Sequence, residues 1–321
     1  MSQQTALVTA IGSFSADIAI KTLHRMNFEV IGCDIYPAEW VADSANVDRF
    51  YQAPYVRDTE EYLAFLKRIC LEHAVAWLLP STDIEVDLLC AKKEEFAECG
   101  VTICVSDEPV IRTCRDKLRL PGLLTDQSLV SLIPTQTAEG VDPDALTYPL
   151  ILKPVDGRSS EGCHVVENAQ GLAYFLSIHS GRSMLIQPRI PGRILTADVV
   201  CDGKTVACIA RRELLRTGNG AGTTVEILEN PTLTRFCTET AKKLGIRGAV
   251  NFEFIEGEDG SLYFLEINPR FSGGVEFSHI AGYPVVEQHL RCFMGQPILP
   301  CGPVRHLTIA RKYEEYIMTE S

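Results

Sequence analysis

The N-terminal part of the sequence alternates short apolar runs with longer amphipathic segments, and this alternation restricts the fold more than any other feature. The runs "TALVTAIG" (5–12), "FEVIGCDI" (28–35) and "VAWLLPS" (75–81) have the length and composition of buried strands. They alternate with helix-like segments, "SADIAIKTLHRMN" (15–27) and "TEEYLAFLKRICLEHA" (59–74). Strands and helices at this spacing form βαβ units, so we expect a parallel sheet here.

The turn after the first expected strand has only the outline of a dinucleotide-binding fingerprint. Asp34, at the end of the second expected strand, stands where an acidic residue would bind a ribose. However, Ala10 and Ser15 occupy two of the three glycine positions that allow a backbone to approach a pyrophosphate closely. A structural half-Rossmann unit is therefore the favoured interpretation, and dinucleotide binding is the alternative.

Composition and charge disfavour nucleic-acid-binding, membrane and exported proteins. The chain has 321 residues and a formal net charge of −12, which disfavours nonspecific binding to nucleic acids or anionic membranes. No window approaches the roughly 18 consecutive apolar residues of a membrane span, and the N-terminus lacks an export signal. The 12 cysteines form no C-x-x-C pair and no zinc-like spacing, which suits a reducing compartment. We therefore expect a cytoplasmic protein without nucleic-acid or membrane partners.

Beyond residue 107 the pattern changes from α/β to α+β. The segment "DEPVIRTCRDKLRL" (107–120) predicts a helix that leaves the parallel sheet, and a turn-rich stretch follows it. Later strands are joined by tight turns. Asp259-Gly260, for example, joins "GAVNFEFIE" to "SLYFLEINPR", which predicts an antiparallel hairpin.

Three side chains with oxygen atoms lie on that hairpin. Glu253 is on the first arm, and Glu266 and Asn268 are on the second. Facing residues of a hairpin lie within about 5 Å of each other, so the two carboxylates can meet at one point. Two carboxylates and an amide oxygen suit Mg²⁺, which keeps water ligands and completes its shell with nucleotide phosphates. The alternative is an edge hairpin with a solvated polar face.

Lys153 is a second chemical feature, because it ends the apolar run "YPLILK" and precedes the glycine-containing loop 156–162. Ammonium and backbone N–H groups both donate hydrogen bonds to anionic oxygens, so this arrangement can bind phosphate. The signal is weak on its own. The sequence contains no G-x-x-x-x-G-K-[ST] motif, which excludes a Walker-type nucleotide site.

The sequence resembles the ATP-grasp superfamily in segments that occur in the order and roughly the spacing of that superfamily. They are "RDKL" with Lys117, "LILKPVDGRSSEG" with Lys153, "LIQPRIPG" with Gln187, and the pair "NFEF" and "FLEINPRFSGG". The likeness is strongest to single-unit carboxylate–amine ligases similar to carbamoyl phosphate synthase, the group of the pyrrolysine-pathway ligase, and it covers nearly the whole chain.

This resemblance implies a fold of mixed α/β and α+β class. An N-terminal half-Rossmann parallel sheet domain (1–112) would be followed by an ATP-grasp fold. The ATP-grasp fold would consist of a small lid subdomain (113–189) and a C-terminal antiparallel sheet subdomain with the metal site (190–321).

The resemblance also implies a role for each matching residue. Two lysines would bind the nucleotide phosphates under a mobile lid, and the hinge that begins at Gln187 would bind adenine. The implied nucleotide-binding residues are Lys117, Lys153, Gly157, Arg158, Ser159, Ser160, Gly162, Gln187, Pro188, Arg189 and Ile190. The implied ligands of two Mg²⁺ ions, which Mn²⁺ can replace, are Glu253, Glu266 and Asn268. Arg270 would stabilise the transferring phosphoryl group.

Two positions depart from the superfamily pattern. Arg193-Ile194-Leu195 follows Gly192 where a ribose-binding glutamate is common, and Glu161 occupies a lid position where a basic or small residue is common. The first departure concerns ribose binding and the second concerns phosphate binding. The metal ligands match the pattern.

The implied activity is a Mg-ATP-dependent ligation of a carboxylate to an amine, on amino-acid-like substrates, through an acyl phosphate. Arg211, Arg212 and Arg216 can bind the substrate carboxylate or the acyl phosphate, because paired donors match those oxygens. Alternation along a strand means that only one of Arg211 and Arg212 can point into the site. We therefore regard Arg270, Arg211 and Arg216 as the catalytic candidates, with solvated surface arginines as the alternative.

Two other functions stay open at this point. The chain could phosphorylate a carboxylate or bicarbonate without forming an amide, or it could bind a nucleotide without catalysis. The expected partners are small-molecule acid and amine substrates, together with a second copy of the chain in a homodimer.

Overall fold

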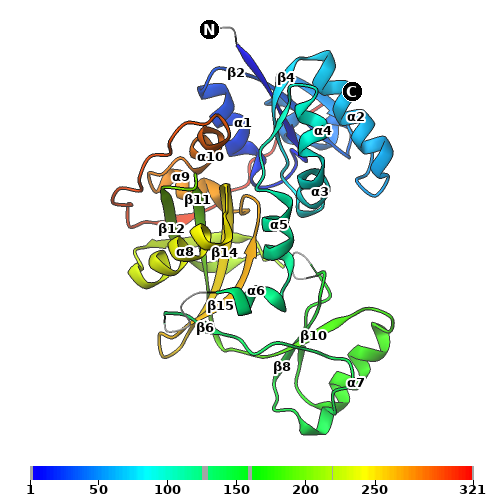
Figure 1. The fold of residues 1–321 in the computed structure, drawn as a ribbon, viewed down its shortest axis with the longest axis vertical. Helices are drawn as coiled ribbons and strands as arrows, with labels where there is room; N and C mark the ends of the chain where they lie inside the picture. The colour runs from blue at the N-terminus through cyan, green and yellow to red at the C-terminus, as the bar shows by residue number, and fades with distance from the viewer. Residues whose placement is uncertain (1–2, 125–128, 158–160, 219, 320–321) are drawn as a thin grey trace.

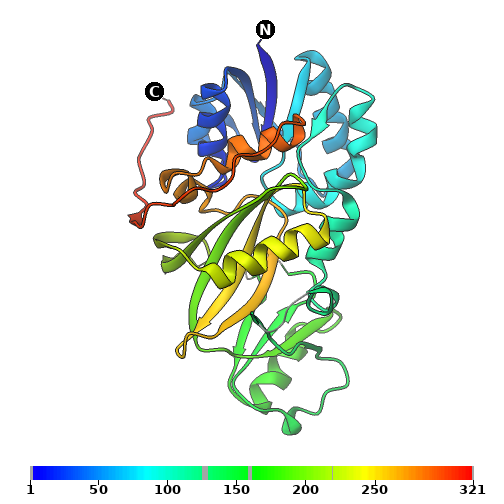
Figure 2. The same cartoon turned by 60° about the vertical axis from the view of Figure 1, so that its left-hand side comes forward.

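The computed structural model describes residues 3–124, 129–157, 161–218 and 220–319, and within them the strands form three β-sheets (Figure 1). The N-terminal sheet lies at one end of the molecule, a small sheet lies at the other end, and a large sheet lies between them (Figures 1 and 2). Short 3₁₀ turns occur at Ala38–Trp40, Ala42–Ala45, Cys90–Lys92 and Pro143–Ala145. The expected change from a parallel sheet to antiparallel sheets is confirmed.

The N-terminal sheet is parallel and has the strand order β3-β2-β1-β4-β5. Its strands are β1 (Gln4–Thr9), β2 (Phe28–Asp34), β3 (Arg49–Gln52), β4 (Val75–Leu79) and β5 (Thr102–Ile103). The helices between them are α1 (Ala16–Arg25), α2 (Thr59–Glu72), α3 (Asp83–Leu89) and α4 (Lys93–Ala97). β1 is buried from Thr5 onward because helices cover both faces of the sheet, which explains its continuous apolar sequence.

Asp34 fixes the first loop of this sheet. One carboxylate oxygen accepts a hydrogen bond from Gly12 N at 2.9 Å, and the other accepts one from Tyr36 N at 3.2 Å. Asp34 is only 6% exposed, so the chain's own backbone occupies both of its oxygens. This arrangement favours the structural interpretation of the half-Rossmann unit over ribose binding.

The small sheet is antiparallel and has the order β7-β10-β8-β9. Helices α5 (Glu108–Arg115) and α6 (Arg119–Leu123) precede it in the chain. Its elements are β7 (Gln136–Thr137), β8 (Leu150–Pro154), β9 (His164–Val166), α7 (Ala169–Ile178) and β10 (Met184–Pro188). α7 covers one face, where Leu172 packs with Leu152 and Ile186 in a small separate core.

The large sheet has the order β16-β13-β12-β11-β14-β15-β6. Its strands are β6 (Ser131–Leu132), β11 (Gly192–Cys201), β12 (Val206–Arg216), β13 (Gly222–Leu228), β14 (Gly248–Gly257), β15 (Leu262–Asn268) and β16 (Thr308–Ala310). β6 pairs with β15 in parallel, although it comes from the chain between the two other sheets. The other pairs are antiparallel.

Helices cover both faces of the large sheet. α8 (Pro231–Leu244) lies on one face (Figure 2). There Phe236 packs against the rings of Phe254 and Phe264. α9 (Val275–Ile280) and α10 (Val285–Phe293) lie on the other face. Residues of α10 share a core with α1, so the N-terminal sheet and the large sheet are packed together through these helices.

His289 on α10 connects the N-terminal sheet to the large sheet through two hydrogen bonds. Its Nδ1 accepts from Ala249 N on β14 at 2.8 Å, and its Nε2 lies 3.0 Å from Cys104 O, which follows β5. The backbone oxygen can only accept, so Nε2 carries the proton. Burial lowers the pKa of His289 to about 3, against a weaker opposing effect of the bond to Cys104.

Two further observations concern the whole described chain. None of its helices is both long enough and apolar enough to cross a membrane. All 12 cysteines carry free thiols, and most of them are buried in the cores.

The neutral state of His289 predicts an acid sensitivity. The pKa of His289 is lower in the folded than in the unfolded protein, so the folded state is favoured while His289 stays neutral. This contribution to stability is complete above the unfolded pKa and is lost as the pH falls below it. We expect it to decrease by about 2 kcal/mol between pH 7 and pH 5. His289→Gln keeps one donor and one acceptor but does not titrate. Urea unfolding at both pH values should therefore show a smaller loss in this variant than in the wild type, and equal losses would contradict the prediction.

Candidate active site

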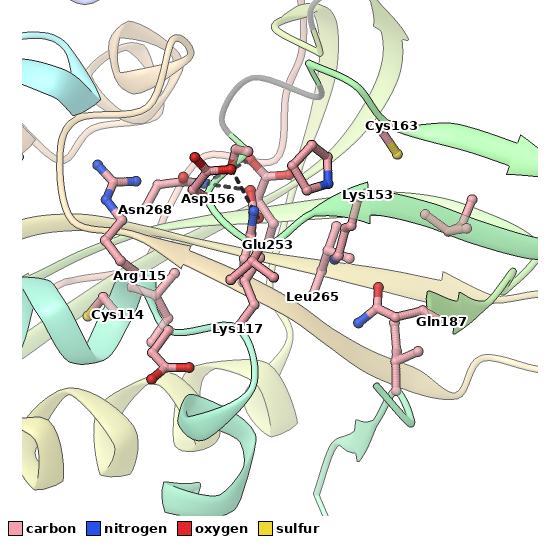
Figure 3. Close-up of a pocket in the computed structure, with 18 of the residues that line it drawn as sticks. Cys114, Arg115, Lys117, Lys153, Asp156, Cys163, Gln187, Glu253, Leu265 and Asn268 are labelled. Atoms are coloured by element: carbon pink, nitrogen blue, oxygen red, sulfur yellow. Dashed lines mark hydrogen bonds and ion pairs between the residues drawn. The ribbon is translucent and has the colours of Figure 1, made fainter. Parts of the chain in front are cut away.

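A pocket of about 860 Å³ lies where the small sheet, the large sheet and the part of the chain from α3 to the segment after α5 meet. Figure 3 shows Gln187 at one end and Arg115 at the other, with Lys153, Lys117 and Glu253 between them. Residues from all three parts of the chain line it, and most of the residues proposed from the sequence are among them.

Glu253 and Glu266 face each other in this pocket because β15 contains a bulge. From the turn inward, Ile255 pairs with Tyr263 and Phe254 with Phe264, so an unbroken ladder would pair Glu253 with Leu265. The register shifts by one residue at this point, and Glu253 pairs with Glu266 instead. Bulges of this kind re-aim side chains and are common beside active sites.

Asn268 completes the group. Its Nδ2 donates to Glu266 Oε1 at 3.2 Å and to Glu253 Oε1 at 3.4 Å. Burial, and then the charge of Glu266, raise the pKa of Glu253 to about 7. A carboxylate whose ionisation is disfavoured by burial and by a neighbouring carboxylate belongs to a set that a cation would stabilise.

The chemistry of this donor set fits a hard divalent cation with an incomplete protein shell. Within the described residues no three His, Cys, Asp or Glu side chains gather into a metal-binding cluster. Glu253, Glu266 and Asn268 can supply three oxygens, which leaves the remaining positions to water and to a ligand's phosphates, as Mg²⁺ prefers.

Two lysines lie beside the carboxylates. Lys117 Nζ donates to Gly157 O at 2.6 Å and lies 4.0 Å from Glu266 Oε2. Lys153 is 9% exposed, and its burial lowers its pKa, while Glu266 opposes this effect and Lys117 adds to it. Two lysines and two glutamates thus line the same pocket.

The lid proposed from the sequence is described only in part. Gly157 lines the pocket, whereas Arg158, Ser159 and Ser160 lie outside the described residues. Gly162 has a φ of +69°, and a Cβ there would fall 3.0 Å from Pro154 Cγ, so this position requires glycine. Glu161, noted above as a departure, also lines the pocket.

The opposite end of the pocket is mostly apolar. Pro188, Arg189 and Ile190 line it at the end of β10, together with Gln187. The amide Nε2 of Gln187 donates to Thr135 Oγ1 at 2.6 Å, so this side chain is already engaged. The apolar lining residues are Ile133, Ile151, Ile194, Ile255, Leu265 and Ile267. Such walls suit a flat aromatic ring.

The polar motifs of the sequence do not indicate that these apolar residues line the pocket. Ile194 was noted only as a departure, and it places a hydrocarbon surface where a ribose-binding carboxylate is common. Alternation on β15 would have assigned Leu265 to the face opposite Glu266, but the bulge brings both into the pocket lining.

Of the three arginines on β12 and its end, only Arg216 lines the pocket. Its Nη2 lies 3.6 Å from Glu253 Oε2, and its Nε donates to Gly220 O at 2.8 Å. Arg212 lies on the opposite side of the strand, where it pairs with Glu226 and Glu256.

Arg211 is fully buried and does not line the pocket. Its nitrogens bond to Asp198 at 2.7 Å, to Ser272 at 3.0 Å and to Glu213 at 3.2 Å. Neither Arg211 nor Arg212 lines the pocket, and each guanidinium nitrogen of Arg211 already has a partner within the protein.

Arg270 also lies outside the pocket lining. Its Nε and Nη2 each donate to the carboxylate of Asp83 at 2.9 Å, and its Nη1 donates to Phe271 O. Asp83, the first residue of α3, also bonds to Arg115, which does line the pocket. Burial alone would raise the pKa of Asp83, but Arg270 and Arg115 outweigh it and lower the pKa. The N-terminal domain thus holds two arginines with one carboxylate.

The Asp83 contacts predict a large loss of stability in Asp83→Asn. Loss of a carboxylate from a mostly buried ion pair leaves two guanidinium groups poorly compensated, so we expect the free energy of unfolding to fall by about 3 kcal/mol. Asp107→Asn is the matched control, since Asp107 pairs with Lys93 at the surface and should cost less than about 1 kcal/mol. Urea unfolding checks both values, and similar losses in the two variants would contradict the assignment.

Comparison with known proteins gives two family matches. Residues 180–313 match the family described as "ATP-grasp in the biosynthetic pathway with Ter operon", and residues 9–104 match "PylC-like, N-terminal domain". Carbamoyl phosphate synthase large chain of Thermomicrobium roseum is 28% identical over an alignment 304 residues long that covers 87% of this chain. The chain spans only 27% and 28% of the lengths of two such curated relatives.

Solved structures resemble nearly the whole chain. A biotin carboxylase β,γ-ATP complex from Campylobacter jejuni has a TM-score of 0.77 at 20% identity and covers 94% of this chain and 73% of its own. An L-amino acid ligase from Bacillus licheniformis has a TM-score of 0.70 at 14% identity and covers 91% of this chain and 74% of its own. At these identities the similarity concerns the fold.

Proposed function

Since the chain consists of a PylC-like N-terminal domain followed by an ATP-grasp domain, we propose that it is an ATP-dependent ligase that joins a carboxylate to an amine. The fold expected from the sequence, a parallel sheet domain followed by an ATP-grasp fold, is confirmed by the solved structures it resembles. We further propose that both substrates are small molecules with amino-acid-like groups, and that the products include ADP and phosphate.

The observation that carries the proposal is the facing pair Glu253 and Glu266, with two lysines beside it in one pocket. In this proposal ATP lies along the pocket, with adenine between the apolar residues and the end of β10. The phosphates reach Lys117 and Lys153, and the Mg²⁺ ions, for which Mn²⁺ can substitute, bind Glu253, Glu266 and Asn268. The domain boundaries near residues 112 and 189 are also part of the proposal.

The first chemical step transfers the γ-phosphoryl group. A substrate carboxylate oxygen attacks the γ-phosphorus, and the bond to the β,γ-bridging oxygen breaks, which releases ADP and leaves an acyl phosphate. The bound metal supplies charge neutralisation for this step. Arg216 is the guanidinium nearest the carboxylate pair, and we assign it to the transferring group. Arg270 stays bonded to Asp83 in this scheme, and its positive charge partly offsets the rise in the pKa of Glu253.

The second step forms the amide. The amine nitrogen attacks the carbonyl carbon of the acyl phosphate, phosphate leaves with the former carboxylate oxygen, and the nitrogen loses a proton. No protein nucleophile is needed, because the acyl phosphate is already activated. The protein positions both reactants and excludes water that would hydrolyse the intermediate. Arg211, whose bonds are all internal, supports the Ser272 loop in this scheme.

A second candidate is phosphorylation of a carboxylate or bicarbonate without an amine. Its support is the fold similarity to biotin carboxylase and the sequence similarity to carbamoyl phosphate synthase. We also propose a cytoplasmic location, which suits the many buried thiols, and a homodimer as the assembly to test.

An ADP-release assay distinguishes these functions. The wild-type protein with Mg-ATP should release ADP with a mixture of amino acids, which supplies both carboxylates and amines. If N-acetylated amino acids or bicarbonate alone gave the same rate, the second candidate would hold. If ATP bound but no acid or amine stimulated ADP release, the ligase proposal would be wrong.

Glu266→Gln tests the metal assignment. The change keeps the shape of the side chain but removes a charge, so we expect ADP release to fall by at least about 100-fold, a loss of roughly 3 kcal/mol in transition-state stabilisation. Glu256→Gln is the matched control, because Glu256 lies on the same hairpin but pairs with Arg212 outside the pocket. Retained turnover in Glu266→Gln, with a normal melting temperature, would contradict the assignment.

A further inference from the structure

The middle of the pocket differs chemically from its two ends. One end carries the lysines and the carboxylates, and the other carries Gln187 and the end of β10. From β10 the chain continues through Ile190 and Gly192 into β11, and both of these residues line the pocket. The first residues of β11 therefore connect the end of β10 to the carboxylates along one wall of the pocket.

The strand register shows which side chains lie at each level of this wall. Thr196 on β11 pairs with Glu253 on β14, at the level of the carboxylates. Two residues closer to the end of β10, Ile194 pairs with Ile255, and both isoleucines line the pocket. Two residues of a strand span roughly 7 Å, so this isoleucine pair lies between the carboxylates and the end of β10.

The polar side chains nearest to Ile194 do not face the pocket. Arg193 does not line it, as expected for the next residue of a strand. Thr196 is only 3% exposed, and its Oγ1 donates to Glu213 at 2.9 Å. Tyr263 continues the row of the isoleucine pair on β15, but it does not line the pocket either. Among the described lining residues, the large sheet thus provides only hydrocarbon side chains at this level.

We propose that the site does not select the sugar of its nucleotide, and that Ile194 determines this tolerance. Deoxyadenosine nucleotides then bind at least as tightly as adenosine nucleotides. The inference rests on the proposed function, which places adenine beside the end of β10 and the phosphates at the lysines, so that the sugar lies over Ile194 and Ile255. A hydroxyl group that faces these side chains loses water without gaining a partner, so its removal costs no affinity.

The size of the effect distinguishes this site from one that recognises the sugar. A carboxylate that accepted a hydrogen bond from a sugar hydroxyl would favour the adenosine nucleotide by about tenfold to 100-fold. The deoxy analogue would leave that buried carboxylate without its partner. An apolar wall has no such group to leave unpaired.

Isothermal titration calorimetry of the full chain tests the proposal by binding, without turnover. The probes are ADP, 2′-deoxy-ADP and 3′-deoxy-ADP, each with Mg²⁺. We expect the Kd of each deoxy analogue to be lower than that of ADP or at most about threefold higher. A larger loss of affinity for either analogue would overturn the inference, because it would reveal a hydrogen bond to the missing hydroxyl.

Ile194→Glu assigns the tolerance to this side chain. The new carboxylate can accept a hydrogen bond from the sugar, so at least one deoxy analogue should bind about tenfold more weakly than ADP. The ratio of the two Kd values cancels any repulsion between the carboxylate and the phosphates, since both nucleotides carry the same phosphates. Ile194→Gln, which adds no charge, should change the ratio in the same direction and serves if Ile194→Glu does not fold.

Arg193→Glu is the matched control, because it places a carboxylate one residue away and outside the pocket lining. Its Kd ratio should equal that of the wild type. Wild-type ratios in both Ile194→Glu and Ile194→Gln would overturn the role of Ile194.

The outcomes separate this inference from the proposed function. Weaker binding of a deoxy analogue to the wild-type protein would overturn the inference and leave the ligase proposal intact, since ADP would still bind. If ADP itself did not bind in the presence of Mg²⁺, the inference and the ligase proposal would both fall.

Discussion

The facing of Glu253 and Glu266 is the constraint on which the site depends, and a single bulge in β15 creates it. Without the bulge at Leu265, the regular ladder from the Asp259-Gly260 turn would place this leucine opposite Glu253. The bulge brings the second carboxylate and Asn268 into the same face of the sheet. Burial, and then the charge of Glu266, raise the pKa of Glu253, and a cation bound there, as we propose, would stabilise both carboxylates.

The N-terminal domain contributes to this site both through pocket walls, which include Asp87 and Cys90, and through contacts that hold arginines in place. Asp83 holds Arg270 and Arg115, and His289 joins the end of β5 to β14. A shared core between α1 and α10 makes these contacts rigid. Through Asp83, the parallel sheet domain therefore holds Arg115 at one end of the pocket together with Arg270, which gives its Rossmann-like unit a structural role.

Local sequence patterns predicted the elements well, because alternation and turn residues act over short distances. The parallel sheet and the antiparallel hairpin follow from such patterns. The pairing of Glu253 with Glu266 also needs the bulge in β15, which alternation does not indicate. The positions of Arg270 and Arg211 do not, because they depend on partners that are distant in sequence. Asp83 is 187 residues from Arg270, and Ser272 is 61 residues from Arg211. The pairing of β6 with β15 is a similar case, since nothing in Ser131-Leu132 indicates its partner.

The central claim is that a carboxylate is activated as an acyl phosphate in this pocket. Turnover of Mg-ATP with amino acids labelled with ¹⁸O in their carboxylates tests it most directly, by mass spectrometry of the released phosphate. The account predicts that each phosphate carries one ¹⁸O atom from a carboxylate for each ADP formed. Formation of ADP with unlabelled phosphate would contradict it.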